Sequence, residues 1–130
     1  MKILISFFLL LLTTNNSDCN KFRIGEFEIL SKFGGKIIIE RTENFQTETL
    51  TRNGNVTRYK IKWKSKCSYI LFDRKLLKGK EEITDTKFRE KLNKDTIFCN
   101  IVEVKGNESR VVSKMGNFPD SLESIIKKTK

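Results

Sequence analysis

Hydrophobic and polar residues alternate most strictly between residues 58 and 71 of this chain. The apolar side of the stretch carries Tyr59, Ile61, Trp63, Cys67, Tyr69 and Leu71, and the opposite side carries Arg58, Lys60, Lys62, Lys64 and Lys66. Because successive side chains leave opposite faces of a strand, the pattern predicts a half-buried central β-strand whose aromatic side chains belong to the core. We expect this strand to continue past residues 65–66, with or without a bulge. A tight turn at that point would place Lys60 and Lys62 on the same face as the apolar residues.

Further segments have the composition of strands, at residues 22–33, 36–42, 46–52, 96–104 and 109–115. Turn sequences separate them at Gly34-Gly35, Asn53-Gly54 and Gly106-Asn107. Residues 85–92 fit a short helix capped by Asp85, and a second helix is expected after Pro119, at the C-terminus. The sequence therefore predicts a single, mainly β domain: an antiparallel meander of six or seven strands, barrel-like or half-covered by a short C-terminal helix.

The chain begins with the features of a secretory signal peptide. Lys2 is followed by an apolar run over residues 3–12 and a small, polar stretch over residues 13–18. This run of ten residues, in which only Ser6 is polar, is too short to span a bilayer as a helix, so no transmembrane anchor is expected after cleavage. We predict a signal peptide over residues 1–17, one exported domain over residues 18–130, and a secreted or periplasmic location.

Three cysteines, Cys19, Cys67 and Cys99, remain after such a cleavage, and an exported protein can keep disulfides. Three pairings are possible, and each leaves one thiol free. We favour a Cys19–Cys67 disulfide, which would tie the N-terminus of the mature chain to the inner face of the central strand. Cys99 lies in an apolar segment and is expected to be a small core residue.

A net charge of +10 favours contact with anionic partners. The basic side of residues 58–71 is the candidate surface, either as a plain solvated face or as a binding site for anionic glycan or lipid head groups. Nucleic acid binding would require aromatic side chains among the charges, and Tyr59, Trp63 and Tyr69 are expected to point the other way.

Arg41, Gln46 and Glu48 form a candidate polar group in an otherwise apolar hairpin. If Thr42 pairs with Thr47, Arg41 lies opposite Glu48 on the inner face. Such a pair would either be satisfied internally at the edge of the core, which we favour, or line a ligand cleft.

Catalysis finds little support in the residue types present. Histidine is absent, which excludes the metal sites and catalytic triads that depend on it, and no glycine-rich phosphate loop occurs. We therefore expect no enzyme activity and no cofactor.

Four short patterns resemble a family of small exported bacterial proteins, often lipoproteins, of unknown function. They are Cys19-x-x-Phe22-x-x-Gly25-x-Phe27, Ile39-x-Arg41, Gln46-x-Glu48, and Trp63-x-x-x-Cys67-x-Tyr69-x-Leu71. This chain differs from the lipoprotein members because Asn16 and Asp18 replace the aliphatic and small residues of a lipidation signal. The resemblance implies an exported location and no particular active site.

The sequence thus predicts a small, exported, non-catalytic binding module, which acts through the Arg41/Glu48 edge or the mouth of a barrel. The alternative is a basic protein of the cell envelope that holds anionic glycan or lipid on its lysine-rich strand face. The ligand, or a protein partner, is not defined by the sequence.

Overall fold

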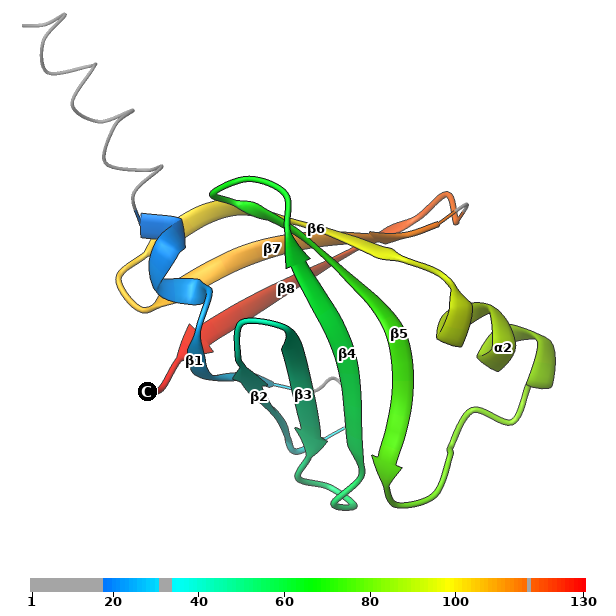
Figure 1. Ribbon diagram of the computed structural model, residues 1–130. Coiled ribbons are helices and arrows are strands. Elements are labelled where there is room, and N and C mark those ends of the chain that lie inside the picture. Colours follow the sequence, from blue (N-terminus) through cyan, green and yellow to red (C-terminus); the bar gives the residue numbers. More distant parts are fainter. Residues whose placement is uncertain (1–17, 31–33, 117) are drawn as a thin grey trace, which may run out of the picture.

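The computed structural model describes residues 18–30, 34–116 and 118–130 of the chain. Its strands are β1 (Gly25–Leu30), β2 (Lys36–Arg41), β3 (Phe45–Leu50), β4 (Val56–Trp63), β5 (Ser68–Lys78), β6 (Ile97–Lys105), β7 (Glu108–Met115) and β8 (Ser121–Lys128). A 3₁₀ helix, η1 (Asp18–Phe22), precedes β1, and the helix α2 (Thr86–Lys94) lies between β5 and β6. Each strand pairs antiparallel with the next and β8 pairs with β1, which closes an eight-stranded barrel (Figure 1). The predicted signal peptide lies outside the described residues.

The inner faces of all strands except β3 supply buried apolar side chains to one core. It contains Cys19, Phe22, Phe27, Ile39, Tyr59, Ile61, Tyr69, Leu71, Cys99, Ile101, Val111 and Ile126. Tyr59 and Tyr69 are buried, and Trp63 is half-buried against the core, with its ring 4.7 Å from that of Tyr69 between centroids. The alternation in residues 58–71 therefore sorts the aromatic side chains inward and the lysines outward.

The central segment is a hairpin, so the prediction of one continuous strand was wrong. A turn follows Trp63, and β5 begins at Ser68. The pairs Trp63↔Tyr69 and Ile61↔Leu71 bring apolar residues of both strands onto the same face. The expected mixing of lysines with the core does not occur, because directly paired residues share one face of a sheet and the apolar residues pair with each other.

The C-terminal segment is strand β8, which corrects the expected C-terminal helix and raises the strand count to eight. β8 pairs along its length with β7 and, near its end, with β1 through Phe27↔Lys128 and Glu28↔Lys127. The charges of this segment fit the two ends of a helix. However, closing the barrel gives both neighbouring strands a hydrogen-bonding partner, and this long-range gain outweighs the local pattern.

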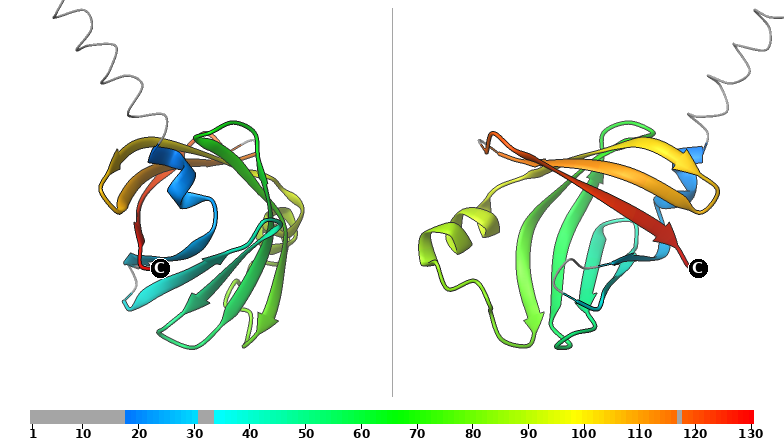
Figure 2. Two further views of the ribbon diagram at one scale, coloured as in Figure 1. Left: turned by 60° about the vertical axis from the view of Figure 1, so that its left-hand side comes forward. Right: turned by 180° about the vertical axis from the view of Figure 1, so that it is seen from behind.

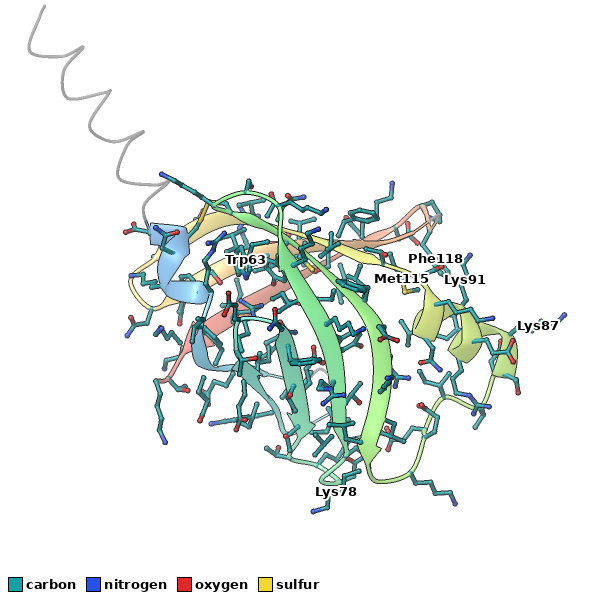
Figure 3. All side chains as sticks on the ribbon, in the orientation of Figure 1. Trp63, Lys78, Lys87, Lys91, Met115 and Phe118 are labelled. Carbon is teal, nitrogen blue, oxygen red and sulfur yellow. A yellow bond between two sulfur atoms is a disulfide. The ribbon has the colours of Figure 1, made fainter. Side chains whose placement is uncertain are left out.

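Two shorter predictions agree with the structure. Helix α2 starts where expected, and Asp85 caps it by accepting a hydrogen bond from the Phe88 backbone N–H at 3.1 Å. The helix lies against β5, and its Phe88 ring meets the edge of Phe118 at 5.9 Å between centroids. Figure 3 shows Lys91, Met115 and Phe118 gathered on this side of the barrel, with Lys87 pointing away from it.

One end of the barrel is plugged by η1. Figure 2 shows this short helix lying at the barrel end that is also occupied by the β6–β7 turn. Its Cys19 and Phe22 side chains are buried, and Phe22 stacks on Phe27 with 5.8 Å between ring centroids. The Cys19–Cys67 disulfide, with a Cα–Cα distance of 5.3 Å, confirms the predicted pairing and attaches the plug to the β4–β5 turn.

Candidate functional site: barrel interior, seam and outer face

A buried arginine organises the plugged end of the barrel. Arg41 is only 3% exposed, and it donates hydrogen bonds to the Phe22 carbonyl, to the Tyr69 hydroxyl and to Gln46 Oε1, each at 2.7 Å. Its guanidinium also lies over the rings of Tyr69, Phe27 and Trp63, at 4.6, 5.1 and 5.9 Å from their centroids. Figure 3 shows Trp63 at this end of β4. Arg41 therefore joins the plug to the barrel wall.

The three predicted polar residues are connected by hydrogen bonds, from Arg41 to Gln46 and from Gln46 to Glu48. The prediction of a direct Arg41–Glu48 pair was wrong. The strands are paired two residues away from the expected register, with Arg41 opposite Gln46 and Ile39 opposite Glu48. A shift of two preserves the face, so all three side chains still point inward. Gln46 accepts from Arg41 and donates to Glu48 Oε2 at 2.7 Å. Among the described residues, no acidic side chain lies within ion-pairing distance of Arg41.

The interior shifts the acid–base behaviour of several groups. Burial raises the pKa of the Glu48 carboxyl, and this effect exceeds the opposing effects of the Gln46 hydrogen bond and of the Arg41 and Arg74 charges. Burial likewise raises the pKa of the Tyr59 and Tyr69 hydroxyls and of the Cys99 thiol. The interior therefore favours the neutral forms of these groups, so the tyrosines and Cys99 are held as hydrogen-bonding groups, which is unlike an activated nucleophile.

A second inner arginine, Arg74, was missed by sequence reasoning. The register between β4 and β5 shifts beside Asp73, which has a φ of 53°, and the Arg74 side chain lies close enough to Tyr59 to interact with its hydroxyl. Its side chain, 9% exposed, pairs with Glu81 at 3.1 Å and donates to Asn93 Oδ1 of α2 at 2.8 Å. A non-glycine residue with positive φ is uncommon, and no feature of the sequence around Asp73 indicates the bulge.

The seam between β1 and β8 contains a cavity of about 480 Å³. The apolar side chains that line it are Ile29, Leu30, Ile37, Leu122 and Ile125, and the polar ones are Glu28, Glu108, Glu123, Ser124 and Lys127. β1 and β8 pair through two residues each in the ladder, and backbone hydrogen bonds of Glu26 with Thr129 and Lys130 extend the contact toward the plugged end. Beyond Glu28, the strands separate and the cavity begins.

A lysine holds the closed part of the seam together. Lys128 Nζ donates to the Lys21 carbonyl at 2.7 Å and to the Ile24 carbonyl at 3.1 Å. Gly25 allows the chain end to approach, because it has a φ of 136° and any Cβ there would collide with the Lys130 carbonyl oxygen. The closed part of the seam is therefore fixed by specific contacts, in contrast to the part that borders the cavity.

The predicted basic residues lie on the outer face, where they differ from one another. Lys60, Lys62, Lys64 and Lys66 are exposed, whereas Arg58 is half-buried with its guanidinium 4.5 Å from the centroid of the Phe45 ring. Lys60 pairs with Asp73 at 3.1 Å, and this pairing lowers the pKa of the Asp73 carboxyl.

Aromatic side chains from neighbouring strands share this outer face. Lys60 lies between Phe45 and Phe72, and Lys62 pairs with Ile70, which pairs with Phe98. Tyr59, Trp63 and Tyr69 face the core as expected. Aromatic side chains of neighbouring strands nevertheless lie among the charges of the outer face.

Cys99 is a free, buried thiol in β6 and accepts a hydrogen bond from Ser113 Oγ at 3.4 Å.

The described residues contain no grouping of three or more His, Cys, Asp or Glu side chains placed to hold a metal ion. Within the same residues, no helix has the length and apolar character that crossing a bilayer requires.

These features define a class of protein: an eight-stranded, up-and-down antiparallel barrel with one plugged end. Barrels of this size either fill their interior with side chains or hold one small ligand. Comparison with protein-family models, with curated proteins and with solved structures found no match to this chain. The resemblance to small exported bacterial proteins therefore stays a prediction.

Proposed function

We propose that this chain is an exported, non-catalytic binding module that holds a small, mainly apolar molecule in the cavity between β1 and β8. One observation carries the proposal: the barrel is closed here by a short ladder, beyond which an apolar cavity of about 480 Å³ lies between the two strands. Small-molecule sites in proteins have volumes of roughly 300–1,000 Å³ and are lined mainly by apolar side chains with few polar groups.

The other inner polar groups support this choice by already having partners. Arg41 is bound to the plug and the barrel wall, and Arg74 is bound to Glu81 and Asn93. A ligand at either arginine would have to displace these hydrogen bonds. At the seam, Leu30 and Leu122 are exposed, so an apolar ligand would cover surface that now contacts water.

The cavity rim favours a ligand without negative charge. Glu28, Glu108 and Glu123 lie around it with a single lysine, Lys127. Glu28 lies 3.6 Å from Lys36, and Glu123 lies 3.1 Å from Arg110, so these two acids are partly compensated. We therefore propose a neutral or cationic apolar molecule as the ligand class.

The exported location is part of the proposal. The disulfide is of the kind that persists in oxidising compartments, and the first residues have the pattern of a signal peptide. N-terminal sequencing of the protein from culture medium or cell envelope is expected to start at Asp18. A chain recovered from the cytoplasm that still begins at Met1 would contradict the exported location.

The test of the binding site uses the neutral fluorescent probe N-phenyl-1-naphthylamine. Leu122→Trp places a bulky side chain at the cavity, and Leu77→Trp places the same side chain on β5, outside the residues that line the cavity; these leucines are 57% and 50% exposed. We expect Leu122→Trp to weaken probe binding by about tenfold or more, the loss of roughly 1.4 kcal/mol, and Leu77→Trp to leave it unchanged. Equal binding by both variants, or no binding by the wild type, would refute the site.

A further inference from the structure

We propose a second site on the outer face of the barrel, which docks on an anionic phospholipid surface. The pairing of strands places four residues in one row across β4, β5, β6 and β7: Lys62, Ile70, Phe98 and Lys114. Lys64 is an exposed residue of the turn that follows β4, two positions after Lys62. We call these five residues the outer basic row.

The row points outward because its members alternate with core residues. Lys62 lies between the inward-facing Ile61 and Trp63, and Phe98 precedes the buried Cys99. Neighbouring strands lie about 4.8 Å apart, so Lys62 and Lys114 are roughly 14 Å apart across the sheet, with the two apolar side chains between them.

The lysines of the row, like most of the described lysines, have no acidic partner. Among the described residues, Lys62, Lys64 and Lys114 take part in no ion pair, whereas Lys36, Lys60 and Lys105 each lie within 4.0 Å of an acidic side chain. The row is therefore a local concentration of uncompensated positive charge on a chain with a net charge of +10.

Phe98 supplies what a purely electrostatic surface lacks. Phe98 is 50% exposed although it lies within a folded sheet, and Ile70 is half-buried beside it. An apolar side chain flanked by lysines matches the boundary of a bilayer, where the ring enters the acyl region and the ammonium groups stay among the phosphates.

The shape of the face favours a membrane over a nucleic acid. Proteins that bind single strands follow the backbone with a basic groove and stack successive bases on aromatic side chains. Here one exposed aromatic ring, that of Phe98, lies on the convex outer face of the barrel. A convex surface with one exposed apolar side chain is suited to contact with a planar membrane. The site is separate from the proposed ligand cavity, since no residue of the outer basic row lines that cavity.

The experiment is vesicle flotation with phosphatidylcholine alone and with phosphatidylcholine containing 30% phosphatidylglycerol. We expect the wild-type protein to bind the anionic vesicles, to release them as salt is raised, and to ignore the neutral ones. The variant Lys62→Gln/Lys64→Gln/Lys114→Gln should bind on the order of a hundredfold more weakly, because each lysine near an anionic surface contributes about fivefold to affinity and the three factors multiply.

The matched control removes the same charge elsewhere. Lys36→Gln/Lys60→Gln/Lys105→Gln neutralises three ion-paired lysines and should change vesicle binding less than about threefold. Equal losses in the two triple variants would overturn the proposal, because they would show an effect of net charge alone.

Phe98 gives a second readout. Phe98→Trp should show a blue shift of its emission on anionic vesicles, and Leu77→Trp, on an equally exposed position of β5, should show none. Circular dichroism and thermal melting check that every variant is folded. Binding of oligo(dT) that depends on the outer basic row, with no binding to vesicles, would also overturn the proposal and would indicate a nucleic acid site.

Discussion

The plugged end of the barrel and the β1–β8 seam solve the same problem in opposite ways. Both are places where the wall of the barrel leaves apolar interior accessible. At the plugged end, η1 fills the opening with Phe22, and a disulfide and the three Arg41 hydrogen bonds hold it there. At the seam, the contacts around Lys128 close one part, and a cavity takes up the rest.

The edge of β5 is an intermediate case that explains the contrast. β5 pairs with β6 only over Ser68–Leu71, so the remainder of its edge is not part of that ladder. Helix α2 lies against β5, and Arg74 binds Glu81 and Asn93 from that connection. Two openings are thus covered by segments of the chain attached through a buried arginine, and the described residues provide no such cover for the cavity at the seam.

The strongest way to break this contrast is to remove Arg41. Arg41→Met leaves the Phe22 carbonyl, the Tyr69 hydroxyl and Gln46 without their donor, and each buried acceptor left unsatisfied costs about 1–3 kcal/mol. We expect the free energy of unfolding in urea to fall by about 3–5 kcal/mol. Arg52→Ala, which breaks an exposed pair with Glu82, should cost less than about 1 kcal/mol. Similar losses in the two variants would show that Arg41 does not fasten the plug.

The disulfide should have the next largest effect. Cys19→Ala/Cys67→Ala opens a loop with a sequence separation of 48, and the chain-entropy estimate for such a loop is at most about 4 kcal/mol. Because Arg41 still binds the plug, we expect a loss of about 2–4 kcal/mol in urea unfolding, with the native fold retained. A reductant should lower the stability of the wild type to that of the variant and leave the variant unchanged. A variant as stable as the oxidised wild type would contradict the role of the disulfide.

The two attachments of the plug were not equally visible in the sequence. The Cys19–Cys67 pairing followed from export and from the inward position of Cys67. The inner face of Arg41, Gln46 and Glu48 also followed from alternation, but their register did not, because a shift of two residues leaves every side chain on the same face. Alternation therefore predicts which side chains of a strand face the core. It does not predict which residues of the adjacent strand lie opposite them.

The features that the sequence did not reveal depend on the closed barrel. The segment Ser121–Lys128 forms a strand because it completes the circle, although its acidic start and basic end fit a helix. Arg74 points inward because of a bulge beside Asp73, and Phe98 joins the basic face because β6 lies beside β5. Each of these features depends on contacts between segments that are distant in the sequence, and the local composition does not indicate such contacts.

Removing the cover of β5 should have a moderate effect and turn that edge into a second open one. Arg74→Leu breaks the contacts with Glu81 and Asn93 in a largely buried place, and we expect a loss of about 1–3 kcal/mol. Hydrogen exchange measured by mass spectrometry should become faster in peptides from residues 72–78 and in α2, and stay unchanged in β2 and β3. Uniformly faster exchange along the whole chain would mean that Arg74 supports the entire barrel and not this one cover.

The smallest predicted effect concerns Glu48, which lies between the fixed plug and the interior. Its pKa is raised mainly by burial, so the folded protein keeps the proton to a higher pH than the unfolded chain does. Over the range between the ordinary and the raised pKa, the folded state binds more protons, and the contribution of this group to stability falls as the pH rises. Glu48→Gln does not titrate and should gain stability relative to the wild type over that range, as measured by urea unfolding from pH 4 to pH 7.

Glu48→Ala separates the charge of Glu48 from its hydrogen bond. It has the same relative gain with pH as Glu48→Gln, because both variants lack the titrating carboxyl. However, alanine also leaves the Gln46 side-chain N–H without its acceptor, so this variant should be less stable than Glu48→Gln by about 1–2 kcal/mol at every pH. A constant difference from wild type across the pH range would mean that the carboxylate is effectively solvated. In that case the interior next to the plug is as open to water as the seam, and the contrast between the two regions fails.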